Sequence, residues 1–428
     1  MSAGVPPATD TLNGVRMIAP PVRQFSRLRH LELLVLLGAL QAFAPLSIDM
    51  YLPAMPVMEK VFHTSAASVQ TTMVTFLLGF ALGQSLYGPI TDRFGRKPPM
   101  YVSLAVFIAS SAACALSPSI PAIAAFRLLQ AVAACGGSVV SRAMVRDLFP
   151  PEELRRVFSM LVLVLGVSPV IAPLIGSYLL LWFGWKAAFV TQALLGCACV
   201  TGMHFRLPES LAHDAKRPLR LDLIKSAYGQ LVKDRTFLGA SIVCGFSSAG
   251  AFAYITSAPF VFISLYKVPT ERFGWLFGAI AAGMVISSQI NGRMPSRVPV
   301  WRVLRTANLV QFVAGLLLLA SVLTGIGGLP GVFVTVFAYI AAQGFVFPNG
   351  SAIAMMRHGK IAGTASALLG TNQFFIAAIA TIFLGFLDNP AVPMALVIAG
   401  SGIASTALNF LTLGARLEMA PQAAVKAG

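Results

Sequence analysis

The chain has 428 residues, of which 57% are hydrophobic and only 11% are charged. A soluble domain carries roughly 25% charged residues, so this composition excludes an ordinary soluble protein and indicates a polytopic helical membrane protein. The formal net charge of +16 could suggest nucleic-acid binding, but the placement of the basic residues argues against such a partner.

Twelve apolar stretches follow one another along the chain. Each is long enough to cross about 30 Å of hydrocarbon at 1.5 Å per residue. The N-terminal segment lacks a cleavable signal pattern, so the first stretch is expected to be retained. The predicted spans are approximately 31–51, 67–90, 99–117, 120–142, 157–180, 186–205, 237–264, 272–292, 303–324, 330–354, 360–387 and 391–414.

The basic residues divide unequally between the two sides of these spans. Of the 31 Lys and Arg residues, only Lys60, Lys186, Lys267 and Arg272 fall in the loops of one side. The positive-inside rule therefore predicts that both termini lie in the cytoplasm. The basic excess is then a topology signal that also contacts lipid headgroups, and no nucleic-acid partner is expected.

The first span contains the only acid in the interior of an apolar stretch, Asp49, since Glu32 lies at the inner edge of this span. A charge within the bilayer costs at least ~2.5 kcal/mol, so it is rarely kept without a use. Asp49 can gain and lose a proton, and we expect it to be the proton carrier. The alternative is that Asp49 only caps the end of this span beside water.

The fourth span contains Arg127, the second charged residue in the interior of the spans. Arginine cannot lose its charge, so it can only be a counter-ion or an anchor. Both Asp49 and Arg127 lie towards the outer ends of antiparallel spans, which predicts an ion pair, direct or through water. The alternative is an arginine that extends to the outer headgroups.

The fifth span combines prolines and glycines within eleven residues, 166–176. These residues must bend or loosen the helix. A kinked membrane helix without a special role is the alternative interpretation. The residues concerned are Gly166, Pro169, Pro173 and Gly176.

The longest internal polar segment, residues 207–236, divides the spans into two sets of six. Its LDLIKSAYGQLV portion has helical spacing and is expected to lie along the inner face. The predicted fold is all-α, with two six-helix bundles that enclose a midplane site. The expected domains are a cytoplasmic N-tail (1–30), bundles 31–206 and 237–414, the cytoplasmic central loop 207–236 and a cytoplasmic C-tail (415–428).

Several polar and aromatic residues inside the spans could line a cavity for an apolar ligand. Aromatic residues in spans more often pack than bind, so packing is the alternative for each of them. The candidates are Gln41, Gln130, Tyr254, Phe345, Phe347, Asn349, Gln373 and Phe374. No catalytic constellation, nucleotide motif or metal-ligand cluster is visible, and no CxxC pair occurs among the five cysteines. We therefore expect no enzyme activity, cofactor or metal.

Four motifs resemble those of the major facilitator superfamily. The loop GPITDRFGRK (88–97) resembles the signature GxLaDrxGrk, and RLLQA (127–131) resembles RxxQG, with Ala131 in place of glycine. Span 5 resembles the antiporter motif gxxxGPxxGG, with Ala172 and Ser177 replacing glycines. The chain also resembles the bicyclomycin-resistance (Bcr/CflA) family of drug:proton antiporters. The runs that carry this resemblance are DMYLPAMP (49–56), RAMVRDLF, SAPFVFI, GFVFPNG and GTASALLGTNQF.

The resemblance implies that loop 88–97 is a latch between the halves that stabilises the outward-open state. Asp92 would be the latch acid that meets the start of span 11 near Gly359–Gly363, and Arg96 would reach Asp147. The implied latch residues are Gly88, Asp92, Arg93, Gly95, Arg96, Lys97 and Asp147.

The resemblance further implies a proton-driven, alternating-access exporter of small apolar or cationic drugs in a bacterial inner membrane. Its partners would be protons, the drug and the lipid bilayer, and we expect it to function as a monomer. One alternative is a proton-coupled exporter of a specific metabolite, such as an amino acid or a sugar, on the same fold. A membrane-embedded enzyme or receptor is a more distant alternative that would move no substrate.

Overall fold

The computed structural model describes residues 27–211, 221–295, 297–387 and 389–413. All regular elements within these ranges are helices, and twelve of them are long and apolar enough to cross a membrane. The predicted all-α fold with twelve spans is therefore confirmed. The expected C-tail, and the N-tail before residue 27, lie outside the described residues.

Six spanning helices come from the first half of the chain and pack against one another. Their apolar side chains form the larger part of one core cluster around Phe43, Tyr51 and Phe76. The helices are α1 (Arg27–Asp49), α3 (Ala66–Phe94), α4 (Lys97–Leu116), α5 (Ile120–Leu148), α6 (Pro151–Phe183) and α7 (Lys186–Arg206).

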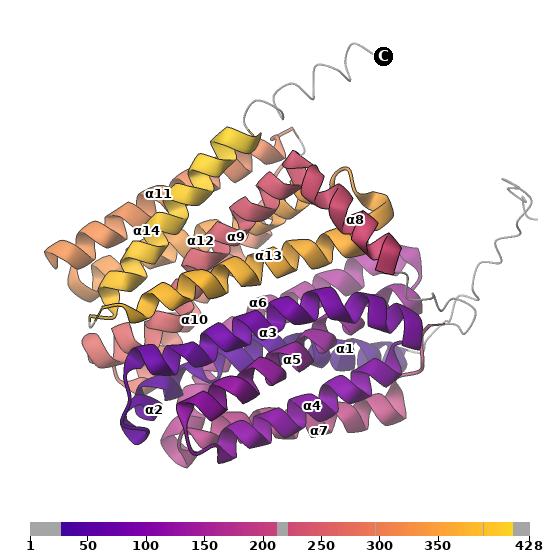
Figure 1. The fold of residues 1–428 in the computed structure, drawn as a ribbon, viewed down its shortest axis with the longest axis horizontal. Coiled ribbons are helices and arrows are strands. Elements are labelled where there is room, and N and C mark those ends of the chain that lie inside the picture. Colours follow the sequence, from indigo (N-terminus) through magenta and orange to yellow (C-terminus); the bar gives the residue numbers. More distant parts are fainter. Residues whose placement is uncertain (1–26, 212–220, 296, 388, 414–428) are drawn as a thin grey trace, which may run out of the picture.

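Six further spanning helices form a second group (Figure 1). They are α9 (Arg235–Pro259), α10 (Thr270–Gly292), α11 (Val300–Thr324), α12 (Gly328–Met355), α13 (Ala362–Ile382) and α14 (Ala391–Leu408). Short 3-10 or π segments extend or precede them: η3 (Phe260–Leu265), η4 (Gly359–Ile361), η5 (Phe383–Gly385) and η6 (Asn409–Leu413). The helix predicted in the central loop is present as α8 (Leu221–Lys233).

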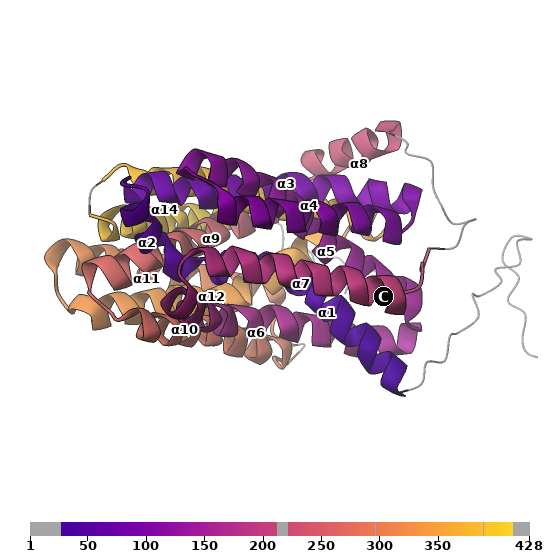
Figure 2. The same ribbon diagram turned by 90° about the horizontal axis from the view of Figure 1, so that it is seen from below.

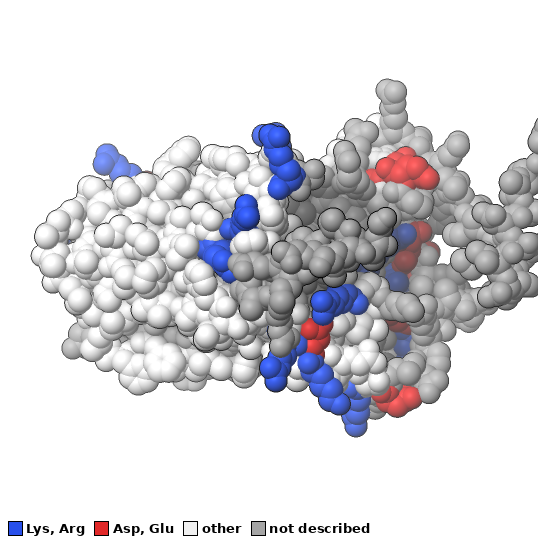
Figure 3. Space-filling view, turned by 90° about the horizontal axis from the view of Figure 1, so that it is seen from above, with Lys and Arg blue, Asp and Glu red and all other residues white. Residues whose placement is uncertain are grey.

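The two ends of the bundle differ in charge. We call them the α2 end, where the short helix α2 (Met55–Val61) lies, and the α8 end, where α1 begins and α8 lies (Figure 2). In the face shown in Figure 3, the described charged side chains gather mainly towards the α8 end, while most of the remaining surface is uncharged. This pattern is expected for a membrane protein whose uncharged sides face lipid and whose basic residues gather at one end.

The first span bends where the sequence reads DMYLPAMP. Helix α1 ends at Asp49, and the chain then passes through η1 (Leu52–Ala54) into α2. Pro53 and Pro56 each lie in the first turn of one of these two short segments, where a missing N–H costs nothing. The bend places Asp49 at a helix end inside the protein rather than within a continuous helix.

The fourth span is longer than predicted. Helix α5 continues past residue 142 to Leu148, because the next proline in the chain is Pro150 and no glycine intervenes. Arg142, the last residue of the predicted span, therefore lies within the spanning helix rather than at its end.

The two groups of helices meet along two seams, α3 with α13 and α6 with α10. Across the first seam, the Ser85 and Thr371 hydroxyls are hydrogen-bonded at 2.8 Å. Across the second, Gly278 lies so close to α6 that an added Cβ would be 3.1 Å from the Val170 carbonyl oxygen. Small residues thus allow the backbones of the two groups to approach closely.

Candidate transport site

A cavity of about 580 Å³ lies between the two groups of helices. It extends from Asp49 to Met355, the last residue of α12, so it faces the α8 end. Most of its wall is apolar, with a few polar groups. Its lining is Gln41, Ala44, Pro45, Ile48, Asp49, Phe80, Gln84, Ser138, Arg142, Leu165, Pro169, Ala251, Phe252, Tyr254, Ile255, Phe277, Ala281, Met284, Ile340, Phe347, Ser351, Met355, Ser366, Leu369, Gly370, Gln373 and Phe374.

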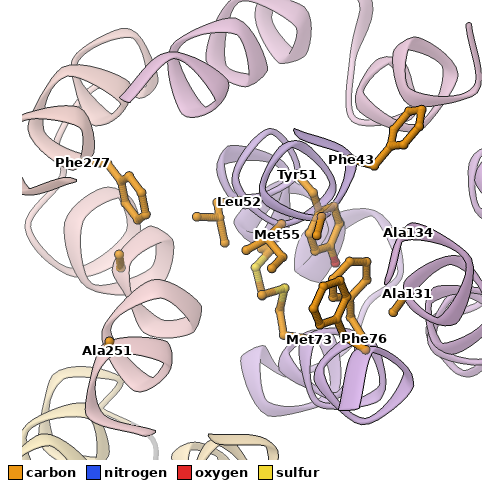
Figure 4. Packing of buried hydrophobic residues seen from close by; sticks show 14 of the residues in the cluster. Phe43, Tyr51, Leu52, Met55, Met73, Phe76, Ala131, Ala134, Ala251 and Phe277 are labelled. Atoms are coloured by element: carbon orange, nitrogen blue, oxygen red, sulfur yellow. The ribbon is translucent and has the colours of Figure 1, made fainter. Parts of the chain in front are cut away.

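The α2 end of the cavity is closed by packed apolar side chains. Figure 4 shows Leu52 and Met55 between the rings of Tyr51 and Phe76 on one side and Phe277 on the other. Segment η1 contacts α9 and α10, and α2 contacts η3. The bend after Asp49 therefore fills the space between the two groups at this end.

Asp49 lies at the closed end of the cavity with only 4% of its surface exposed. Tyr254 lines the same cavity from α9. Among the described residues, no donor forms a hydrogen bond with the Asp49 carboxylate, and the Tyr254 hydroxyl is also without a partner. A buried carboxyl group without fixed donors is suited to binding and releasing a proton.

Arg127 is fully buried within the first group of helices. Its Nη1 donates to the Ser47 carbonyl oxygen (2.8 Å) and to Gln130 Oε1 (2.9 Å). Its guanidinium carbon lies 4.2 Å from the Phe76 ring centroid and 4.8 Å from that of Tyr51. The charge is therefore stabilised by carbonyl dipoles and aromatic faces rather than by a carboxylate.

Of the predicted arrangements of Asp49 and Arg127, the direct ion pair is not formed among the described side chains. The two residues do lie on contacting helices, α1 and α5, but Arg127 bonds to Ser47, two residues before Asp49. The physical reason is that the bend after α1 directs Asp49 towards the cavity, while Arg127 points into the first group. Its extension to the outer surface is also excluded, because the side chain is completely buried.

The structure brings five of the eight predicted cavity residues to the cavity: Gln41, Tyr254, Phe347, Gln373 and Phe374. Gln41 Oε1 accepts from the Ser141 hydroxyl (2.8 Å), and Gln373 Nε2 donates to the Ser248 hydroxyl (2.7 Å).

The other three predicted residues do not line the cavity. Gln130 is fully buried and donates to Ser111 (2.6 Å) and Gln192 (2.8 Å) inside the first group. Asn349 donates to Asn291 Oδ1 (2.7 Å) on α10, and Phe345 packs in a separate apolar core. The sequence identified these three as polar or aromatic residues inside spans, but it did not show which helix each of them contacts.

Several lining residues were not predicted from the sequence. They include Phe80, Gln84, Arg142, Phe252 and Phe277. Arg142 could have been found, because the run RAMVRDLF contains no helix breaker and continues the helical pattern of span 4. The phenylalanines carry no signal that separates them from ordinary packing residues.

The glycines and prolines of span 5 lie at close contacts. Pro169 lines the cavity. An added Cβ on Gly166 would be 3.2 Å from Val285 of α10, and one on Gly176 would be only 2.2 Å from the Met50 carbonyl oxygen. Helix α6 therefore contacts both the second group and the residue that follows Asp49.

The loop between α3 and α4 forms an ion-pair cluster. Arg96 Nε donates to Asp147 Oδ2 (2.8 Å), and Arg96 Nη1 donates to Asp92 Oδ1 (2.8 Å). Burial acts to lower the pKa of Arg96, but the hydrogen bonds with Asp147 and Asp92 outweigh it and raise the pKa. The predicted contact of Arg96 with Asp147 is present. No hydrogen bond joins Asp92 to Gly359 or Gly363, which are both described.

Glu209, just after α7, completes this cluster and was not predicted. Its two carboxylate oxygens accept from the backbone N–H groups of Arg96 (2.9 Å) and Lys97 (3.0 Å) at the start of α4. Lys97 Nζ donates to the Leu207 carbonyl oxygen (2.7 Å). Gly95 has a positive φ of 94°, and an added Cβ would lie 2.9 Å from Glu209. Glycine is thus required for this loop to close over Glu209.

A largely apolar cavity between two groups of six spanning helices, with a buried acid at its closed end, defines a multi-pass membrane transporter. Residues 37–381 match the model of the Major Facilitator Superfamily. The chain belongs to this superfamily and, within it, to the bicyclomycin-resistance (Bcr/CflA) family.

Similar proteins support this assignment. The chain is 35% identical to the uncharacterized MFS-type transporter YdgK of Bacillus subtilis, over 85% of this chain and 91% of that protein. It is 32% identical to a bicyclomycin resistance protein homolog of Haemophilus influenzae, over 88% and 95%. It is 30% identical to a chloramphenicol resistance protein of Pseudomonas aeruginosa, over 84% and 85%.

One solved structure with the same fold is a bacterial homolog of the human lysosomal transporter Spinster, in an inward-facing and occupied conformation. The TM-score is 0.72 at 17% identity, covering 92% of this chain and 99% of that chain. At this identity the likeness concerns the fold alone.

Proposed function

We propose that the protein is a proton-coupled exporter of antibiotics and other drugs that works by alternating access. The observation that carries the proposal is the cavity between the two groups, with Asp49 at its closed end. Relatives named for resistance to bicyclomycin and chloramphenicol support drugs as the substrates.

In the proposed cycle, residues 31–206 and 237–414 are the two units that rock against each other. Drug and proton compete, because the drug prefers the cavity with Asp49 ionised and the proton neutralises it. Arg127 is a positioning residue in this cycle, since it fixes the Ser47 carbonyl two residues before Asp49. Tyr254 lines the cavity from the opposite unit and would respond to the charge of Asp49.

The proposed orientation places the α8 end in the cytoplasm of a bacterium, with the protein in the inner membrane. The gathering of charged residues at that end supports it. The cavity is then open to the cytoplasm. In this proposal the latch forms in the outward-open state. The described residues Asp92 and Gly363 are not hydrogen-bonded to each other, as expected for an open latch when the cavity faces the cytoplasm. The proposed functional unit is a monomer in lipid.

Efflux from proteoliposomes tests the proposal. Purified protein is reconstituted, chloramphenicol or bicyclomycin is loaded, and a pH gradient is imposed. We expect efflux of both compounds that a protonophore stops and that the other compound inhibits. An exporter of one metabolite would move neither compound. Gradient-independent movement would exclude proton coupling.

A further inference from the structure

The cavity contains a second ionisable side chain besides Asp49, Arg142 on α5. Its Nε donates to the Ser138 carbonyl oxygen (2.9 Å), four residues earlier in the helix. The guanidinium is therefore turned back along α5, towards the α2 end. An arginine near a helix end normally extends towards the nearer membrane surface, so this orientation is the reverse of the usual one.

The two terminal nitrogens of Arg142 remain available to a ligand. Within the described part of the chain, no acceptor is hydrogen-bonded to Nη1 or Nη2. Apart from Asp49, the other polar cavity residues from the first group of helices are the neutral Gln41, Gln84 and Ser138, and Gln41 Oε1 already accepts from Ser141. Arginine carries a permanent charge and a planar set of donors, which fit a carboxylate in a bidentate manner.

Arg142 and Asp49 lie at different depths in the cavity. Ser141, next to Arg142, is hydrogen-bonded to Gln41, and Gln41 precedes Asp49 by eight residues on α1. Eight residues of helix span roughly 12 Å. The wall of the same cavity includes the apolar rings of Phe80, Phe252 and Phe374. The cavity thus has a basic side chain at one depth, an acidic side chain at another and an aromatic wall.

We propose that Arg142 is the substrate-anchoring residue for an anionic or strongly accepting group, and that the preferred ligand is an elongated dipolar amphiphile. Its basic or donor group lies near Asp49 and its acidic group on Arg142. The inference rests on the proposed exporter function and names its substrate class. A ligand with both groups can be exchanged for a proton, because its basic group competes with the proton at Asp49.

A matched set of four biphenyl compounds tests the proposal. Each carries a para carboxylate or carboxamide at one end and a para aminomethyl or methyl group at the other. Binding to purified protein in lipid nanodiscs is measured by calorimetry at neutral pH. We expect the wild-type protein to bind each carboxylate about tenfold more tightly than its carboxamide, as for a charge-assisted hydrogen bond.

The variants separate the roles of the two side chains. Arg142→Gln should bind carboxylate and carboxamide equally, whereas Asp49→Asn should keep the carboxylate preference and lose the preference for the amine. The control is Arg146→Gln, which removes the same charge from the same helix. Arg146 lies over the Phe158 ring at 6.0 Å and is not part of the cavity wall, so both preferences should persist.

Two results would overturn the proposal: a wild-type protein without a carboxylate preference, or an Arg142→Gln variant that retains it. If Arg142→Gln fails to fold, Arg142→Lys replaces it, because lysine keeps the charge but lacks the planar set of donors. The preference of the wild-type protein for carboxylate over carboxamide then still tests the proposal. Binding is measured without a gradient. A carboxylate preference combined with no gradient-driven efflux would therefore contradict the proposed exporter and leave the anchoring role intact.

Discussion

Asp49 and Arg127 lie on neighbouring helices but have different surroundings. Asp49 faces the cavity without a hydrogen-bond donor among the described residues, whereas Arg127 is held by the Ser47 carbonyl and Gln130. This arrangement leaves the carboxyl group free to titrate and keeps the permanent charge fixed. The two residues therefore fit a division between a proton carrier and an anchor.

Replacing Asp49 with asparagine should abolish export driven by a pH gradient, because the amide cannot carry a proton. Efflux from proteoliposomes under an imposed gradient measures the effect. Glu59→Gln is the matched control, since Glu59 lies on α2 in the same span and is not part of the cavity wall. Undiminished gradient-driven efflux by Asp49→Asn would contradict the assignment of the proton carrier.

At the scale of elements, α6 connects the bend after Asp49 with the second group of helices. Gly176→Ala should introduce a Cβ at 2.2 Å from the Met50 carbonyl oxygen, which the backbone can relieve only by moving. We expect a loss of about 1–3 kcal/mol in stability, as for other overpacked sites, together with slower transport. Thermal unfolding and efflux rates measure both effects.

The control for Gly176→Ala is Gly229→Ala on α8. No heavy atom lies within 4 Å of a Cβ added at Gly229, and alanine favours helix more than glycine does. This variant should be at least as stable as the wild type. Equal behaviour of the two variants would show that the contact of α6 with Met50 does not constrain the site.

The start of α9 is tied to the loop after α12 by one carboxylate. Asp234 Oδ1 accepts from the Thr236 N–H (2.8 Å), and Oδ2 lies 2.9 Å from His358 Nε2. Burial acts to raise the pKa of Asp234, but the hydrogen bonds from Thr236, His358 and Phe237 outweigh it, so the pKa falls below its ordinary value of 3.8. The ionised form is therefore stabilised by folding.

The sign of this shift predicts a pH dependence. A lowered pKa contributes stability that is fully present above 3.8 and is lost as the pH falls through the lower folded value. Asp234→Ala should cost about 1 kcal/mol at neutral pH, as for other helix N-caps, and its difference from wild type should shrink below pH 3.8. Melting temperatures across the pH range measure this.

Ser65→Ala provides the control for the pH dependence. Ser65 caps α3 by accepting from the Ser68 N–H (3.2 Å), and a hydroxyl does not titrate in this range. Its destabilisation should be independent of pH. A parallel pH dependence in both variants would show that the carboxylate of Asp234 is not its cause.

At the scale of the whole molecule, the proposed cycle requires the α2 end to open. A Cβ on Gly385 would lie 2.8 Å from the Cβ of Ala67, across the seam of α3 with the second group. Disulfides join Cβ atoms about 3.8 Å apart, so a cysteine pair at these positions needs only a small shift. Oxidised Ala67→Cys/Gly385→Cys protein should stop transporting, and a reductant should restore transport.

Each single-cysteine variant is the control for this cross-link and should transport under both conditions. The native cysteines are free, and four of the five are buried. Continued transport by fully cross-linked protein would contradict alternating access through the α2 end.

The fold was largely predictable because twelve long apolar stretches leave few alternatives, and the pair of Arg96 with Asp147 followed from a recognised motif. The cavity was predicted in part. The sequence shows that Gln130 is a polar residue inside a span, but not that Gln192 on α7 accepts a hydrogen bond from it. Arg142 was missed because the predicted span ended at this residue, although the helix continues past it to Leu148. Contacts between distant helices decide these cases, and local sequence does not contain them.

The burial of Arg127 without a carboxylate partner has a consequence for leakage. A fixed positive charge in a low-dielectric region repels protons and metal cations and raises the barrier to their unassisted passage. Because no carboxylate neutralises its charge, Arg127 would reduce the leak of protons through the protein when no drug is bound. Arg127→Gln proteoliposomes should therefore dissipate an imposed pH gradient faster than wild type in the absence of drug, as a pH-sensitive dye would report. Equal dissipation rates would show that the packed side chains at the α2 end form the seal unaided.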